Sequence, residues 1–333
     1  MAECKPCDIA AAVKLLAEGE LVAFPTETVY GLGADARSTS AVRKIFAAKG
    51  RPATNPLIVH VADETIARRY AAPWPKQAEQ LAARFWPGPL TLVLPKSPQI
   101  VSEVTAGLAT VGLRVPNHPV ALELLKRFDG PVAAPSANRS GRVSPTTADH
   151  VRAELGDRIG CILDGGPCQV GIESTVLALI ESTPAILRPG GVSRTQIEKL
   201  IGPVEIASPA TTHEAAMSPG MGAEHYRPAA AMFRFETEQA GQVIQWFRHN
   251  PQQKCWVLIL AGSPAVAVLQ NAAAGLHKLV IVPDDPEAYA QKLYATLHAA
   301  DKDGAKVIWA QEPPGAPPWQ AVRDRLRRAS KAI

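Results

Sequence analysis

Lys49 and Arg51 lie two residues apart in a turn that contains Gly50 and Pro52, and Asn55 follows shortly after them. Lysine supplies a compact positive charge and arginine a planar fork of N–H donors, so the two suit phosphate or carboxylate groups. Far downstream, SANRSG at 136–141 places hydroxyl and amide donors beside a glycine, which lets backbone N–H groups approach an anion. Together the two segments predict a site for a polyanion, with a triphosphate as the first candidate. Either segment alone is equally consistent with a solvated loop.

The segments that must position these side chains alternate between short apolar runs and amphipathic helices. The pattern indicates an α/β domain with a mixed, twisted sheet. Asp8 predicts the N-cap of the first helix, and Gly19 its end. The expected helices are 8–19, 40–48, 63–71, 76–85 and 118–128, and the expected strands are 21–24, 56–61, 90–95, 111–116, 131–137, 159–164, 174–180 and 185–188.

From about residue 231 helix and strand alternate regularly. The expected helices are 240–249, 263–274, 286–299 and 318–330, and the expected strands are 255–260, 278–282 and 306–310. This alternation predicts a smaller Rossmann-like domain with a parallel α/β sheet. No G-x-G-x-x-G follows its first expected strand, so we do not interpret the domain as a dinucleotide site.

Residues 203–230 differ from both domains, because they are rich in Ala, Pro, Ser, Thr, Gly and Met and lack periodicity. This composition is typical of a linker. The segment ends in His225-Tyr226-Arg227-Pro228, which is chemically rich for a spacer, and long structureless stretches are either disordered or functional. We therefore predict a catalytic domain at 1–202, a linker or lid at 203–230 and a C-terminal domain at 231–333.

Length and charge set broad limits on the class of protein. A chain of 333 residues favours two domains. The formal net charge of +4, from 35 basic and 31 acidic residues, is too small to require nucleic acid as a partner. The densest basic stretch, at 323–331, is expected to be a solvated face of a terminal helix.

The five cysteines, at 4, 7, 161, 168 and 255, form no regular framework, and their odd number favours a reducing compartment. Cys4 and Cys7 make a single C-x2-C without a second pair, which argues against a zinc site. No run approaches the roughly 20 apolar residues of a membrane span. The N-terminus lacks the apolar core of a signal peptide. We expect a cytoplasmic protein without a membrane partner.

Longer blocks surround the two anion-type segments. In chain order they read ELVAFPTETVYGLGADAR at 20–37, KGRPATNPLIVHV at 49–61, FWPGPLTLVLP at 85–95, TVGLRVPNHP at 110–119, PVAAPSANRSGRVSPT at 131–146, GIESTV at 171–176 and ILRPGGVS at 186–193. In this order they resemble the YrdC-like family, specifically the longer two-domain threonylcarbamoyl-AMP synthases. The resemblance covers most of residues 8–200 and resumes at SPGMGAEHYRP, 218–228.

The resemblance implies a nucleotidyltransferase reaction. L-threonine, bicarbonate and ATP would give threonylcarbamoyl-AMP and pyrophosphate, as the first step of threonylcarbamoyladenosine modification of tRNA. The threonine N-carboxylate would attack the α-phosphate. Since both reactants are anionic, positioning and charge neutralisation must dominate catalysis. Mg2+ is expected with ATP, bound mainly through the phosphates rather than by a dedicated protein site.

The resemblance also implies roles for single residues on the nucleotide side. Lys49 and Arg51 would face the phosphates and carry the catalytic role, and His225 and Tyr226 would form the end of a lid. The expected ATP-binding residues are Arg51, Asn55, Thr110, Ser136, Asn138, Ser144, Arg188 and Tyr226.

Arg114 is the expected partner of the threonine carboxylate, because its fork can bind bidentately. It alternates with Leu113 and Val115 along a strand, so its side chain can point toward a cleft. By resemblance the threonine-binding residues are Thr28, His60, Arg114, the backbone near Ala134, and Ser174. Glu27 and Glu173 also lie in family blocks, but neither is assigned a catalytic role.

Three other interpretations remain open at this point. An RNA-binding module is the main alternative, although the weak net charge and the lack of aromatic ladders count against RNA binding as the main role. Carbamoyl adenylation in hydrogenase maturation would bring acylphosphatase and zinc-finger segments, which this sequence lacks. A non-catalytic regulator would not need all of the intact blocks. Weak RNA binding and transient contact with the tRNA threonylcarbamoyl-transfer machinery are compatible with the enzyme.

Overall fold

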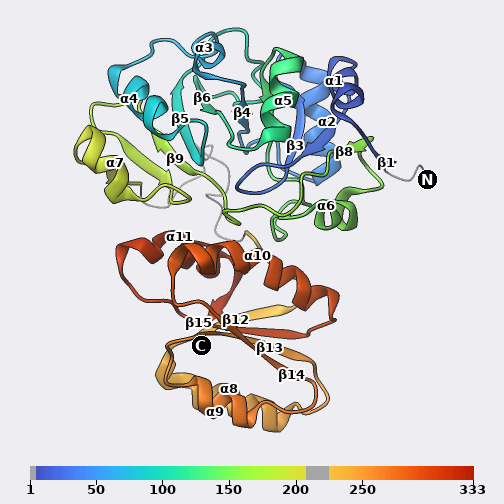
Figure 1. Cartoon of the computed structure of the whole chain (residues 1–333), viewed down its shortest axis with the longest axis vertical. Coiled ribbons are helices and arrows are strands. Elements are labelled where there is room, and N and C mark those ends of the chain that lie inside the picture. The colour runs from blue at the N-terminus through green and yellow to red at the C-terminus, as the bar shows by residue number, and fades with distance from the viewer. Residues whose placement is uncertain (1–4, 208–224) are drawn as a thin grey trace. The chain divides into compact units, whose positions relative to one another are not determined.

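A computed structural model describes residues 5–207 and 225–333 of the chain. Two compact units are distinguished by their internal contacts (Figure 1): Met1–Ser140 with Ser144–Gly222, and Gly141–Val143 with Ala223–Ile333. Much of the linker predicted at 203–230 lies outside the described residues, so its bounds stay a prediction.

The first unit is built around a mixed sheet of eleven described strands, as predicted. Their order is β1-β8-β2-β3-β7-β4-β6-β5-β9-β10-β11. Parallel pairs such as β4–β6 alternate with antiparallel pairs such as β5–β6. The strands are β1 (Lys5–Pro6), β2 (Val22–Phe24), β3 (Gly31–Asp35), β4 (Ile58–His60), β5 (Leu90–Pro95), β6 (Thr110–Arg114), β7 (Val132–Ala133), β8 (Cys161–Ile162), β9 (Thr175–Ala178), β10 (Ala185–Arg188) and β11 (Glu205–Ile206).

Polar caps fix the starts of most helices in this unit. Asp8, Ser38, Asp63, Thr147 and Ser193 each accept a backbone N–H from the first turn, which satisfies donors that the helix leaves unpaired. The Asp8 cap was predicted. The helices are α1 (Ile9–Ala17), α2 (Thr39–Lys49), α3 (Glu64–Ala67), α4 (Lys76–Phe85), α5 (Pro119–Phe128), α6 (Ala148–Leu155) and α7 (Arg194–Ile201).

Strand β3 lies in a stretch where the sequence predicts neither helix nor strand. It pairs antiparallel with β2 and places Gly33 against the buried ring of Phe24. A Cβ at Gly33 would lie 2.9 Å from that ring and 2.9 Å from Val132, so only glycine fits. Gly31 and Gly33 thus allow the close packing of this strand against its neighbours.

The second unit has a five-stranded, all-parallel sheet of order β14-β13-β15-β12-β16, as predicted. Helices α8 and α9 lie on one face of this sheet and α10 and α11 on the other (Figure 1). The described elements are β12 (Ala231–Phe235), η1 (Thr237–Gln239), α8 (Ala240–His249), β13 (Cys255–Leu260), α9 (Val266–Ala272), β14 (His277–Val282), α10 (Pro286–Lys302), β15 (Val307–Gln311), η2 (Pro317–Trp319), α11 (Gln320–Ala329) and β16 (Lys331–Ala332).

The structure differs from the sequence-based expectations for helix α11 and for the pairing of the cysteines. The basic residues of helix α11 do not all face solvent. Arg325 is fully buried, and its Nη1 lies 2.8 Å from Asp324 Oδ2. A disulfide joins Cys7 to Cys161 across the edge pair β1–β8, with Cα atoms 5.7 Å apart, where the sequence predicts no disulfide framework. Cys168 and Cys255 are free and buried, and Cys4 lies outside the described residues.

Among residues 5–207 and 225–333, no helix combines the length and the apolar character that crossing a bilayer requires.

Candidate active site

Arg114 occupies the centre of a buried polar cluster at the end of β6. It is only 4 % exposed. Its Nη2 donates to Thr28 Oγ1 at 2.9 Å and lies 2.8 Å from Glu27 Oε1, and its Nε donates to the Gly88 carbonyl at 3.2 Å. The end of β6, the loop after β2 and the loop before β5 therefore meet at one guanidinium group. Such a cluster is suited to hold a small anionic group out of water.

The loop after β2 is held by a chain of hydroxyl contacts. Thr28 Oγ1 and Thr26 Oγ1 lie 2.8 Å apart, and Thr26 Oγ1 donates to the Val29 carbonyl at 2.6 Å. Thr26 also accepts the backbone N–H groups of Thr28 and Val29, each at 3.2 Å. These bonds fix the loop from within, and so they fix the backbone from which the Glu27 and Thr28 side chains extend.

His60 stands opposite Arg114 in the parallel pair β4–β6. Burial, and then the charge of Arg114, lower the pKa of His60 to about 3, so the imidazole is neutral near pH 7. Its Nδ1 is buried and has no hydrogen-bond partner among the described residues. Ala134, just beyond β7, donates its N–H to the Ile58 carbonyl of β4 at 2.8 Å. The predicted threonine-side residues Thr28, His60, Arg114 and Ala134 thus come together from neighbouring strands.

Ser174 joins a second group of predicted residues. Its Oγ lies 2.8 Å from Thr91 Oγ1, and Arg188 donates to both its carbonyl, at 3.0 Å, and its Oγ, at 3.2 Å. Arg188 is therefore tied to the backbone at Ser174 at the junction of β9 and β10. Gly190 makes this close approach feasible, since a Cβ there would meet the Glu173 carbonyl oxygen at 2.4 Å.

Lys49 brings the two anion-type segments into contact. Its Nζ is buried and donates to the carbonyls of Ser136 and Asn138, while the Ser140 N–H donates to the Lys49 carbonyl at 2.8 Å. Burial, and then the charge of Arg51, hold the pKa of Lys49 well below its ordinary value. Lys49 therefore fixes the 136–140 loop, and carbonyl oxygens surround its amine.

The other predicted nucleotide residues are only partly gathered. Arg51 is buried and donates to the Pro56 carbonyl at 3.1 Å and, from Nε, to the Asn55 carbonyl at 3.4 Å. Ser144 donates to Glu173 Oε1 at 2.6 Å. Thr110 begins β6, at the opposite end of that strand from Arg114.

Tyr226 belongs to the second unit and is buried there, with 1 % exposure. Its ring stacks on Tyr294 with centroids 5.7 Å apart, and the guanidinium of Arg325 lies over it at 5.2 Å. The backbone of Tyr226 has a φ of 65°, which is unfavourable for a residue other than glycine. The His225 ring packs against the Tyr226 ring at 4.3 Å.

Both halves of the chain match known families. Residues 14–190 match the family described as "Telomere recombination", and residues 192–331 match "Threonylcarbamoyl-AMP synthase, C-terminal domain". The threonylcarbamoyl-AMP synthase of Bacillus subtilis is 43 % identical over 97 % of this chain and 92 % of its own length. That of Pyrococcus abyssi is also 43 % identical, over 96 % of this chain and 93 % of its own length. The chain belongs to the YrdC-like threonylcarbamoyl-AMP synthases.

A solved structure of this family extends the match to the whole fold. The crystal structure of Pyrococcus abyssi Sua5 complexed with L-threonine has a TM-score of 0.87 and 40 % identity. The match covers 98 % of this chain and 96 % of the solved chain. The family suspected from the sequence blocks is therefore confirmed.

Glu27 is the residue of this site that sequence reasoning did not assign. Its position between Thr26 and Thr28 in a family block was a signal, since three consecutive polar residues follow a buried apolar strand. The sequence alone does not reveal that Glu27 pairs with Arg114. Arg114 lies 86 residues after Thr28, the neighbour of Glu27, and only the fold brings them together.

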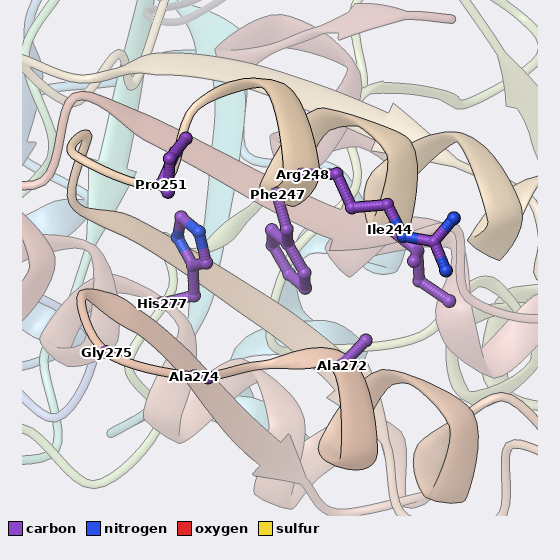
Figure 2. A pocket seen from close by; sticks show the side chains of 8 residues that line it. All are labelled: Ile244, Phe247, Arg248, Pro251, Ala272, Ala274, Gly275 and His277. Carbon is purple, nitrogen blue, oxygen red and sulfur yellow. The ribbon is translucent and has the colours of Figure 1, made fainter.

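Figure 2 shows a hollow of the second unit that is not part of this site. It has a volume of about 370 Å³ and is lined by Ile244, Phe247, Arg248, Pro251, Ala272, Ala274, Gly275 and His277. The Phe247 and His277 rings stack at 4.5 Å between centroids. None of the residues predicted to bind ATP or threonine lines it.

Proposed function

We propose that this protein is an L-threonylcarbamoyladenylate synthase, which converts L-threonine, bicarbonate and ATP into threonylcarbamoyl-AMP and pyrophosphate. The observation that carries the proposal is the buried Arg114–Thr28–Glu27 cluster, with the neutral His60 on the neighbouring strand. This cluster lies in the same unit as the Lys49 and Arg51 segment. Relatives 43 % identical over nearly the whole chain carry the name threonylcarbamoyl-AMP synthase, and a solved relative binds L-threonine.

On the threonine side, Arg114 holds the carboxylate, and Thr28, His60, Ser174 and the backbone near Ala134 surround the rest of the molecule. Neutral His60 accepts or donates a hydrogen bond without adding charge, because its pKa is lowered to about 3. This arrangement differs from the expected bidentate binding of the threonine carboxylate by Arg114. Nε and Nη2 of Arg114 already have protein partners, and so Nη1 is the nitrogen left for the substrate.

On the nucleotide side, Arg51, Asn55, Thr110, Ser136, Asn138, Ser144, Arg188 and Tyr226 hold ATP. Lys49 positions the 136–140 loop through its bonds to Ser136 and Asn138, and Arg51 and Arg188 supply the positive charge. Since the nucleophile and the α-phosphate are both anionic, these fixed charges lower the repulsion between them.

Magnesium enters with ATP. The described residues contain no cluster of three or more His, Cys, Asp or Glu side chains that could hold a metal. A Mg2+ ion that arrives with ATP would keep phosphate and water oxygens as its main ligands. When bound, the ion neutralises phosphate charge.

The bonds change in two steps. The threonine amine forms a C–N bond with the bicarbonate carbon, with loss of water, to give the N-carboxylate. A carboxylate oxygen then forms a P–O bond to the α-phosphorus while the bond to pyrophosphate breaks. The chain's residues position and screen the reactants in both steps. Bicarbonate use, delivery of the product to the tRNA-modifying machinery and location in the cytoplasm are parts of the proposal that rest on the sequence.

Release of pyrophosphate from ATP tests the proposal. We expect release only when threonine and bicarbonate are both present, with serine used about 10- to 200-fold less well because one methyl group distinguishes it. Lys49→Ala and Arg51→Ala should impair the use of ATP. Turnover without an amino acid, or equal turnover with serine, would contradict the assignment.

A further inference from the structure

Glu27 is a buried carboxylate whose hydrogen bonds are incomplete. The residue is 4 % exposed, and neither of its carboxylate oxygens accepts a hydrogen bond from the described residues. Only the charge of Arg114, 2.8 Å from Oε1, compensates it. Burying a carboxylate in this way is costly, because each oxygen can accept about two hydrogen bonds. An acceptor left open in a binding site indicates a donor that arrives with the ligand.

Arg114 is left incomplete in a complementary way. Nε is bound to the Gly88 carbonyl, and Nη2 is shared between Thr28 and Glu27. Nη1 has no hydrogen-bond partner among residues 5–207 and 225–333. The ion pair therefore leaves Nη1 of Arg114 and the buried Oε2 of Glu27 without a hydrogen-bond partner in the same small cluster.

We propose that Glu27 and Arg114 together form a site for a zwitterion, in which Glu27 Oε2 accepts a hydrogen bond from the α-ammonium of the substrate and Arg114 Nη1 donates to its α-carboxylate. An α-amino acid carries these opposite charges on one carbon atom, so a paired carboxylate and guanidinium match it. The identity of the amino acid as threonine rests on the proposed function. The new element is Glu27 as the residue that selects a free α-amine.

The site suits the product of the first step as well as the substrate. After N-carboxylation the nitrogen keeps one N–H, which can still donate to Glu27. The nitrogen would thus remain fixed while the new carboxylate reaches the α-phosphate. Before the first step the α-ammonium loses one proton to solvent and becomes the neutral amine that attacks the bicarbonate carbon. Glu27 forms no covalent bond in this account and only positions the nitrogen.

A 2-hydroxy acid separates this role from a purely structural one. In 2,3-dihydroxybutanoate a neutral hydroxyl replaces the ammonium of threonine, while the carboxylate and the side chain are kept. If Glu27 binds the ammonium, Glu27→Gln should weaken threonine binding by about 10- to 150-fold, the range for a lost hydrogen bond between charged groups. Binding of the hydroxy acid should change little. If Glu27 only orients Arg114, both ligands should weaken together.

The experiment measures the dissociation constants of L-threonine, 2,3-dihydroxybutanoate and ATP by calorimetry with the full chain. Glu103→Gln is the control, because Glu103 pairs with Arg43 at 2.9 Å on the surface of the same unit. We expect a loss that is specific to threonine in Glu27→Gln and no change in the control. An equal loss for both ligands would overturn the inference.

The wild-type protein gives an independent answer if Glu27→Gln does not fold. It should bind threonine at least about tenfold more tightly than the hydroxy acid, whereas equal affinities would contradict the zwitterion site. A failure of the proposed function is distinguishable, because the wild-type protein would then neither bind threonine nor release pyrophosphate with it.

Discussion

At the scale of single residues, the candidate site depends on one buried ion pair. Without Arg114, the Glu27 carboxylate would be left in a dry environment with no compensating charge. We expect Arg114→Met to lower the free energy of unfolding by about 3–5 kcal/mol. The double variant Arg114→Met/Glu27→Met should recover much of this loss, because no unpaired charge remains.

Urea unfolding of the full chain measures both effects. Arg43→Met is the control, because it breaks the ion pair between the mostly exposed Arg43 and Glu103. This variant should lower the free energy of unfolding by about 1 kcal/mol or less. Wild-type stability in Arg114→Met would mean that the Glu27 carboxylate finds another partner or water.

His60 makes stability depend on pH with a definite sign. Its pKa is lowered to about 3 in the folded chain from an ordinary 6.5. Between these values the unfolded chain binds more protons than the folded one, so stability falls as the pH drops. The loss is at most about 1.4 kcal/mol for each pH unit below 6.5. We expect His60→Gln to reduce the slope of the unfolding free energy between pH 6.5 and 4.5.

The matched variant for this measurement is His249→Gln, which removes an exposed imidazole at the end of α8. It should leave the slope unchanged. Equal slopes in the wild-type and His60→Gln proteins would show that folding does not change the protonation of His60.

The charges of the site were predictable from sequence, but their present partners were not. Lys49, Arg51 and Arg114 stand out because of their residue types and the blocks around them. Which oxygen each cation contacts depends on strands far apart in the chain, as when Lys49 meets Ser136. The sequence assigns Glu27 no role, because only the fold brings it to Arg114.

At the scale of elements, apolar runs predicted strands well. The expected strands at 90–95, 185–188 and 255–260 and the helix at 240–249 coincide with β5, β10, β13 and α8. Their burial is continuous or strongly one-sided, so the pattern is visible in the sequence.

The sequence did not predict several elements, because they depend on strand pairing or capping. The hydrophobic periodicity of the sequence does not reveal these interactions. β3 is rich in glycine, and its identity as a strand follows from pairing with β2 and β7. β12 continues from the linker and is recognised by its pairing with β15. Helices α6 and α7 are short and mostly polar, although the capping box of Ser193 and Gln196 was a readable local signal for α7.

Gly33 gives a test at this scale. We expect Gly33→Ala to destabilise the first unit by about 1–3 kcal/mol, because its Cβ would press on Phe24 and Val132 at 2.9 Å from each. Gly160→Ala is the matched control in the same unit, since its Cβ would make only an ordinary contact with Leu15 at 3.9 Å. Thermal unfolding of both variants measures the difference. If Gly33→Ala and Gly160→Ala unfolded at the same temperature, β2 and β3 would have moved apart without loss of stability.

At the scale of the whole molecule, the chain combines a site-bearing unit with a second unit that contains the end of the predicted lid. In the second unit the Tyr226 ring stacks on Tyr294 and the Arg325 guanidinium lies over it, and its φ of 65° is strained. If the Tyr226 ring contacts ATP, as we propose, the nucleotide engages the same ring as Tyr294 and Arg325. The aromatic stack and the nucleotide would then compete for one side chain.

This competition predicts a lid that responds to substrates. The predicted linker 203–230 contains Glu214 and Glu224, so a glutamyl endopeptidase should cut it in the free protein. ATP together with threonine should protect the segment, because a closed lid shields a reactive mixed anhydride from water.

Tyr226→Ala should lose protection and either turn over at least about tenfold more slowly or release AMP. Tyr226→Phe, which keeps the ring, separates the role of stacking from that of the hydroxyl. Unchanged cleavage with both substrates, together with wild-type kinetics in Tyr226→Ala, would reduce the linker to a tether.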